Sequence, residues 1–205
     1  MLRQHKNFLS FAMGLLFTVL SFVAHAQTID ELLHQPNNPI AGNPKGTITV
    51  VDFFDYQCEH CIKMAPVLNA IIKANPNVRI VFKDFPIMGP MSQFAAQAAI
   101  AANMQGKYYE FNHALMTVNQ PLTQELVFEV AKSVGLNMAR LKKDINSPTV
   151  AHQLEANMKL AKSLKLYATP TYFIGKTDTT NEAELMSLLG SMSQAEFQNA
   201  INNVK

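Results

Sequence analysis

Cysteine is scarce in this sequence. The 205 residues include only two, Cys58 and Cys61, which are three positions apart. A disulfide between them would close a very short loop and remove little conformational entropy from the unfolded chain, so it would add little stability. The scarcity therefore excludes a disulfide-stapled scaffold and favours a chemical role for the pair.

The sequence also lacks a surplus of either charge. It has 17 Lys and Arg against 15 Asp and Glu, and two of the basic residues, Arg3 and Lys6, lie in the first 26 positions. The rest of the chain is left with 15 charges of each sign and has no Lys/Arg cluster. We therefore expect no nucleic-acid partner.

Residues 1–26 have the layout of a secretory signal peptide. A short cationic start precedes an apolar run from Phe8 to Val23, and small residues at Ala24 and Ala26 match a cleavage site before Gln27. The alternative is an uncleaved anchor helix. Polar residues interrupt the run, however, and it is short against the ~20 apolar residues of a membrane span. We expect a cleaved signal and no stable membrane span in the mature chain.

Hydrophobic periodicity predicts a βαβ unit after an N-terminal extension at residues 27–46, which reads as a short helix and irregular chain. Apolar, β-branched runs at Thr47–Phe54 and Val78–Phe85 predict two strands, the first of them covered on both faces. The three- and four-residue apolar spacing between them predicts a helix. A crossover helix of this length implies parallel strands and a right-handed connection.

The second half is predicted to be mainly helical. Residues 92–166 carry no strand signal, and Thr123 and Asn137 are placed as helix caps. Strand patterning returns after Pro170. The elements expected there are a strand at Thr171–Ile174, a hairpin partner at Leu185–Leu189 and a closing helix at Ser193–Val204. About 180 mature residues of ordinary apolar content predict one domain.

The two cysteines are placed for thiol chemistry. Cys58 precedes the first predicted helix, where free backbone N–H groups and the helix dipole favour a thiolate. Cys61 lies one turn in, within disulfide reach, as a resolving thiol. His60 can supply positive charge or a hydrogen bond to the Cys58 sulfur, or is merely an exposed polar residue. The charge of Glu59 would oppose the thiolate, unless it only serves as an acid in the first helical turn.

This arrangement resembles the thioredoxin superfamily, and in particular the DsbA-like secreted thiol:disulfide oxidoreductases. The resemblance is carried by the runs Asp-Tyr-Gln-Cys-Glu-His-Cys at 55–61, Lys-Met-Ala-Pro at 63–66 and Ala-Thr-Pro-Thr at 168–171. It implies an α/β protein with a thioredoxin fold and an inserted helical domain. The implied boundaries are 47–91 and 167–205 for the thioredoxin-like domain and 92–166 for the insertion.

The resemblance also assigns roles to residues away from the cysteines. Asp52 and Lys83 are expected to point beneath Cys61, where a desolvated Asp52 would exchange its proton. An ordinary ion pair or a strand-end charge is the alternative. Thr169 and Pro170 resemble the cis-proline loop that faces the active disulfide and binds the substrate backbone. Oxidases of the family often carry Val before this proline, whereas isomerases often carry Thr.

The function expected is that of a periplasmic oxidase that donates its Cys58–Cys61 disulfide to reduced secreted proteins. It would need no cofactor, and a membrane quinone-linked partner would reoxidise it, as the resemblance implies. A disulfide isomerase or reductase is the nearest alternative. A metal-binding or redox-sensing module using the cysteines and His60 is another, but zinc prefers four ligands and His60 is poorly placed, so no metal site is expected.

Overall fold

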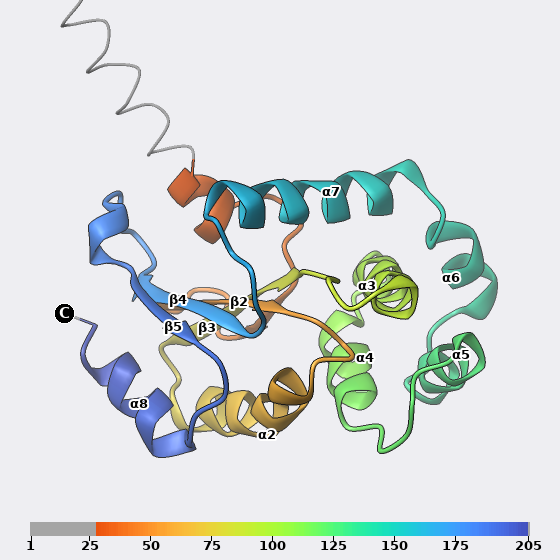
Figure 1. The fold of residues 1–205 in the computed structure, drawn as a ribbon, viewed down its shortest axis with the longest axis horizontal. Helices are drawn as coiled ribbons and strands as arrows, with labels where there is room; N and C mark the ends of the chain where they lie inside the picture. Colours follow the sequence, from red (N-terminus) through yellow and green to blue (C-terminus); the bar gives the residue numbers. More distant parts are fainter. Residues whose placement is uncertain (1–27, 205) are drawn as a thin grey trace, which may run out of the picture.

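The computed structural model describes residues 28–204, and the expected signal peptide at 1–26 lies outside the described residues. Five strands form one sheet in the order β1-β3-β2-β4-β5, with helices on both of its faces (Figure 1). The α/β class and the thioredoxin fold with a helical insertion are confirmed.

The predicted βαβ unit is present. Strands β2 (Ile48–Phe54) and β3 (Val78–Asp84) are parallel and are joined by helix α2 (Glu59–Ala74). Strand β4 (Thr171–Lys176) pairs antiparallel with β2, and β5 (Met186–Leu189) pairs antiparallel with β4. The chemistry-bearing segment therefore starts at the carboxyl end of a central strand.

One strand differs from the sequence-based expectation. Residues predicted to be irregular form β1 (Ile40–Gly42), which pairs antiparallel with β3. The segment Ile-Ala-Gly has little strand propensity of its own, and its conformation comes from pairing with the free edge of β3. The N-terminal extension thus contributes an edge strand to the sheet, after a short helix at residues 28–33.

Between β3 and β4 the described chain is helical, as predicted. The helices are α3 (Pro90–Asn103), α4 (Tyr108–Met116), α5 (Gln124–Ser133), α6 (Met138–Asp144) and α7 (Pro148–Ser163). Thr123 and Asn137 accept backbone N–H groups as the predicted N-caps. After β4 the chain makes a short 3₁₀ turn at Glu182–Glu184, and the closing helix α8 (Gln194–Asn202) starts with a capping box at Ser193.

The two faces of the sheet are covered differently. Helices α2 and α8 lie against one face, and residues 28–33 with α7 lie against the other (Figure 1). Because side chains alternate along a strand, Val50 and Phe54 of β2 join the core on the α2 side, whereas Val51 and Phe53 join the core on the α7 side. Both cysteines belong to the core on the α2 side.

Candidate active site

The Cys58 thiol lies where helix α2 begins. Cys58 is the N-cap of α2 and is 6% exposed, and the backbone N–H of Ile62 donates to its carbonyl. Its Sγ donates to the Thr169 carbonyl oxygen at 3.2 Å, and the Thr169–Pro170 peptide bond is cis. The fold thus brings together two motifs that are 111 residues apart in the sequence.

The second thiol, Cys61, is deeper and is 3% exposed. Both cysteines are free thiols in this structure. Burial strongly raises the pKa of the Cys61 thiol, the Asp52 carboxylate raises it further, and a backbone hydrogen bond from Asp55 opposes both effects. Cys61 therefore leaves a disulfide easily only if a neighbouring acid supplies a proton.

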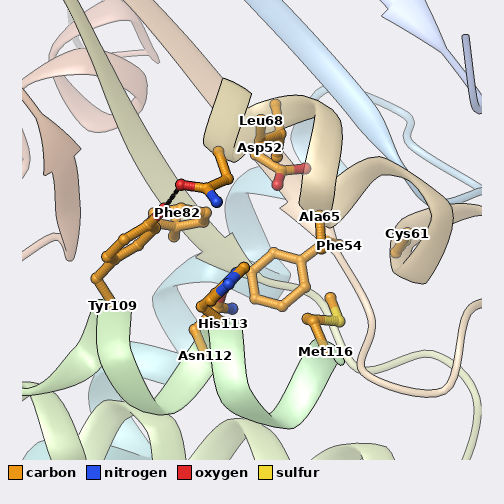
Figure 2. Close-up of a pocket in the computed structure, with 11 residues that line it drawn as sticks. Asp52, Phe54, Cys61, Ala65, Leu68, Phe82, Tyr109, Asn112, His113 and Met116 are labelled. Carbon is orange, nitrogen blue, oxygen red and sulfur yellow. Dashed lines mark hydrogen bonds between the residues drawn. The ribbon is translucent and has the colours of Figure 1, made fainter. Parts of the chain in front are cut away.

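Asp52 is an acid that neighbours Cys61. Its side chain is 3% exposed, and its Oδ1 has no hydrogen-bond partner among the described residues. Burial raises the pKa of Asp52 well above its usual range, and the neighbouring Asp84 carboxylate adds to this. Asp52 and Cys61 line the same narrow cavity (Figure 2). The structure thus places Asp52 beneath Cys61, where the sequence predicted it.

The prediction that Lys83 lies beneath Cys61 is wrong. Asp52 pairs with Phe82 in the β2–β3 register, so Lys83, one residue further on, points to the opposite face of the sheet. Its ammonium group donates to three oxygens: the Glu31 carbonyl (2.7 Å), Gln35 Oε1 (2.7 Å) and Asn38 Oδ1 (2.9 Å). Burial lowers the pKa of Lys83 to about 7, against the attraction of the Glu31 carboxylate. The lysine fastens the N-terminal segment to the sheet.

The two residues between the cysteines face the surface. Glu59 forms an exposed ion pair with Lys63 at 2.7 Å, and the Lys63 hydrogen bond lowers the pKa of Glu59. His60 Nδ1 lies 2.9 Å from Ser191 Oγ, on the segment before α8. Within the described residues the Cys58 sulfur has its hydrogen bond with Thr169 and none with His60. Of the two roles expected of His60, the hydrogen bond to Cys58 is not made among the described residues, and the effect of its charge stays a prediction.

Sequence reasoning missed the role of Asp55, a buried residue three positions before Cys58. Its carboxylate accepts hydrogen bonds from Gln57 N (2.8 Å), Met88 N (2.9 Å) and Ser92 Oγ (2.6 Å). These bonds fix the turn before Cys58 against the start of α3. The available signal was an Asp two residues before a backbone donor in a tight turn after a buried strand.

A second buried polar group, around Asp84, was also missed. The Tyr108 hydroxyl donates to Asp84 Oδ2 at 2.9 Å, and Asn112 Nδ2 donates to the Tyr56 hydroxyl at 3.1 Å. Burial raises the pKa of Asp84 to about 7, although the tyrosine hydrogen bonds lower it. Asp84 is thereby part of the electrostatic environment of Asp52, although the two lie on separate strands.

Beside the Thr169–Pro170 loop lies an open groove. It is formed by the segment from Leu164 to Ala168 and by the neighbouring parts of β4 and β5. Tyr167 is 84% exposed and Leu189 is 68% exposed, so two large side chains that line this groove face solvent. A solvent-facing apolar surface therefore adjoins the loop that contacts the Cys58 sulfur.

Two structural absences hold for residues 28–204. No three His, Cys, Asp or Glu side chains are grouped there so that they could hold a metal ion. No helix in this range is long and apolar enough to cross a membrane.

Comparison with solved structures gives close matches over most of the chain. A thioredoxin-like oxidoreductase from Silicibacter pomeroyi DSS-3 is 36% identical, with a TM-score of 0.76 over 84% of this chain and 95% of that one. BcfH from Salmonella enterica Typhimurium is 30% identical, with a TM-score of 0.74 over 98% of this chain and 90% of that one. The thiol-disulfide exchange protein alpha-DsbA2 from Wolbachia pipientis is 20% identical, with a TM-score of 0.74 over 89% of this chain and 97% of that one. At this identity the match shows that the two proteins share a fold.

Curated relatives match only with a small part of their length. The Na(+)/H(+) antiporter NhaA 1 of Mycolicibacterium gilvum (strain PYR-GCK) is 25% identical over 176 residues, which are 81% of this chain and 28% of that protein. The chain thus spans less than a third of this relative.

The family comparison agrees with the solved structures. The model of the DSBA-like thioredoxin domain matches residues 49–202, which include both cysteines, Asp52 and the Thr169–Pro170 loop. Since this match covers well over half of the sequence, the chain belongs to the DsbA-like thiol–disulfide oxidoreductases of the thioredoxin superfamily.

Proposed function

We propose that this protein is a periplasmic oxidase that passes a Cys58–Cys61 disulfide to reduced secreted proteins. The observation that carries the proposal is the placement of the Cys58 sulfur. It sits at the N-terminus of α2, 3.2 Å from the Thr169 carbonyl, while Cys61 is buried behind it. An incoming thiolate therefore reaches Cys58 first, and Cys61 is the leaving group.

The exchange balances without a further redox group. A substrate thiolate attacks Cys58 Sγ, the Cys58–Cys61 bond breaks, and the Cys61 thiolate takes a proton from Asp52. A second substrate thiolate then attacks the substrate sulfur of the mixed disulfide and releases the Cys58 thiolate. The substrate loses two electrons and the protein gains them, so we propose that no cofactor is required. A membrane quinone-linked partner would remove these electrons and restore the disulfide.

The surface beside Cys58 suits an unfolded substrate. Strand β5 lies at the edge of the described sheet, and the groove around Tyr167 and Leu189 offers apolar contacts. An extended chain crossing Thr169 would bring its cysteine to the Cys58 sulfur through backbone hydrogen bonds, independently of its sequence. Unfolded secreted proteins with free thiols are the substrates that this surface favours. Residues 1–26 would direct the protein to the same compartment.

A disulfide-transfer assay tests the proposal. The oxidised protein is mixed with a reduced two-cysteine peptide, and the reaction is quenched with acid and analysed by mass. We expect one peptide disulfide per protein disulfide. Cys58→Ser should abolish transfer, and Cys61→Ser should retain a mixed disulfide after incubation with an oxidised peptide. No transfer by the wild-type protein would refute the proposal.

Isomerase activity is the second candidate, favoured by Thr169 before the cis-proline. An isomerase acts from its reduced form on a substrate with wrongly paired disulfides. Recovery of a scrambled model protein by the reduced enzyme, without added oxidant, separates the two activities. The isomerase is favoured if the reduced protein restores the scrambled model protein faster than the oxidised protein oxidises the two-cysteine peptide.

A further inference from the structure

Residues of helices α2 and α4 line a narrow cavity (Figure 2). Its lining includes the buried residues Asp52 and Cys61 and the half-buried residues Asn69, Tyr109 and His113, so it extends from the buried site toward solvent. The centre of a water molecule can occupy a volume of about 20 Å³ in this cavity, so the cavity can hold one water molecule. Helix α4 belongs to the inserted helical domain, so this domain forms one wall of the cavity.

The described neighbours of Asp52 within the sheet are buried. They are the Phe82 ring on β3 and the buried Tyr172 on β4, whose hydroxyl has no partner among the described residues. Lys83, the cation expected beside it, points to the opposite face. A proton that Asp52 gives to Cys61 must therefore be replaced from another direction.

The titratable groups around Asp52 differ in their access to solvent. Cys58 and Cys61 face it from the α2 side, Tyr172 from β4 and Asp84 from β3, and all four are buried. Beyond Asp84 are the Tyr56 and Tyr108 hydroxyls, which are also buried. Burial raises the pKa of both tyrosines, so neither is a proton donor to solvent near neutral pH.

His113 is a half-buried residue of the cavity wall, and its imidazole is a side chain that proteins commonly use to shuttle protons. Its ring stacks on Tyr109, with the centroids 6.0 Å apart and the planes inclined by 17°. The Tyr109 hydroxyl is held in turn by Asn69 Oδ1 on α2, at 3.1 Å. The Asn69 bond thus ties Tyr109, on which the His113 ring stacks, to α2.

We propose that His113 exchanges the Asp52 proton with solvent through this cavity. When Cys61 leaves the disulfide, its thiolate takes the Asp52 proton. The His113 imidazolium then returns a proton to the Asp52 carboxylate through a water molecule in the cavity and is itself reprotonated by bulk solvent. Reoxidation runs the same transfers in reverse. The proposal rests on the disulfide exchange proposed above and adds the route by which its proton leaves the protein.

The test is the rate at which a peptide thiol reduces the oxidised protein between pH 5 and pH 8. The chain has no Trp, so acid quenching and mass analysis follow the reaction. His113→Gln keeps a polar side chain but cannot relay a proton, and we expect it to slow reduction roughly three- to tenfold at neutral pH. His152→Gln, on the exposed part of α7, is the matched control and should leave the rate unchanged.

Two further measurements separate proton transfer from a structural effect. Added imidazole should restore the rate of His113→Ala, and His113→Gln should cause no further loss in an Asp52→Asn background. The proposal is overturned if His113→Gln reacts at the wild-type rate across the pH range. It is equally overturned if imidazole fails to rescue or if the loss is the same without Asp52. Disulfide transfer by the wild-type protein would stand in each of these cases, whereas its absence would remove the proposed function itself.

Discussion

Replacing Asp52 with Asn should stabilise the protein, and the gain should grow with pH. Asp52 is 3% exposed and Oδ1 lacks a partner among the described residues, so its ionised form is poorly solvated. Burial raises its pKa in the folded state. Between the pKa of the unfolded chain and that of the folded protein, the folded state holds one more proton than the unfolded state, so wild-type stability falls as pH rises.

The size of the effect has a clear upper bound. An unfolded Asp has a pKa of about 3.9, and each pH unit above it costs at most about 1.36 kcal/mol of stability. From pH 4 to pH 7 the free energy of unfolding can therefore fall by no more than about 4 kcal/mol because of this group. Asn carries no charge at any of these pH values. Its gain should be near zero at pH 4 and reach several kcal/mol, within that bound, at pH 7.

Urea unfolding of the reduced proteins, followed by circular dichroism at each pH, measures this difference. Asp178→Asn, on the exposed turn after β4, removes the same charge from the surface and serves as the control. We expect the Asp52→Asn difference to rise with pH and the Asp178→Asn difference to stay flat. The reasoning fails if Asp52→Asn is no more stable than the wild type at pH 7, or if its gain is the same at pH 4.

Three other substitutions test the remaining assignments. Lys83→Met should lower the free energy of unfolding by about 3 kcal/mol, because three partly buried oxygens lose their donor, yet leave the disulfide-exchange rate unchanged; a lower exchange rate would show that Lys83 does act on the cysteines. Ser92→Ala should cost roughly 1.5 to 3 kcal/mol in urea unfolding, since the Asp55 carboxylate loses a 2.6 Å hydrogen bond; unchanged stability would contradict this. His60→Ala should make the reduction potential more negative by roughly 6 to 20 mV, because the Cys58 thiolate loses a nearby positive charge; no shift in glutathione buffers would exclude that role.

The sequence predicted the site most reliably where a residue broke a local pattern. Asp52 stood out as the one acid in an apolar strand, and the structure places it in the cavity with Cys61. The same reasoning gave the wrong position for Lys83. Strand β3 is buried on both faces, so its sequence shows no alternation that would reveal the face to which Lys83 points. Only the β2–β3 register, which pairs Phe53 with Lys83, decides the face.

Elements that depend on distant partners could not be read from local sequence. The three residues of β1 become a strand by pairing with β3, and Asp55 gains its role only when the Met88 and Ser92 segments fold against it. The Thr169 contact with Cys58 was anticipated from family resemblance, since 111 residues separate the two. The cavity wall formed by α4 had no sequence signal, because nothing in the local sequence connects His113 with Asp52.

The reduction potential of the Cys58–Cys61 pair tests the central claim most directly. The purified protein, without residues 1–26, would be equilibrated with glutathione buffers, and the oxidised fraction counted by thiol alkylation. An oxidase must hold its disulfide less tightly than its substrates do, so we predict a potential toward about −120 mV. A value near about −270 mV, as in reducing members of the superfamily, would contradict the account.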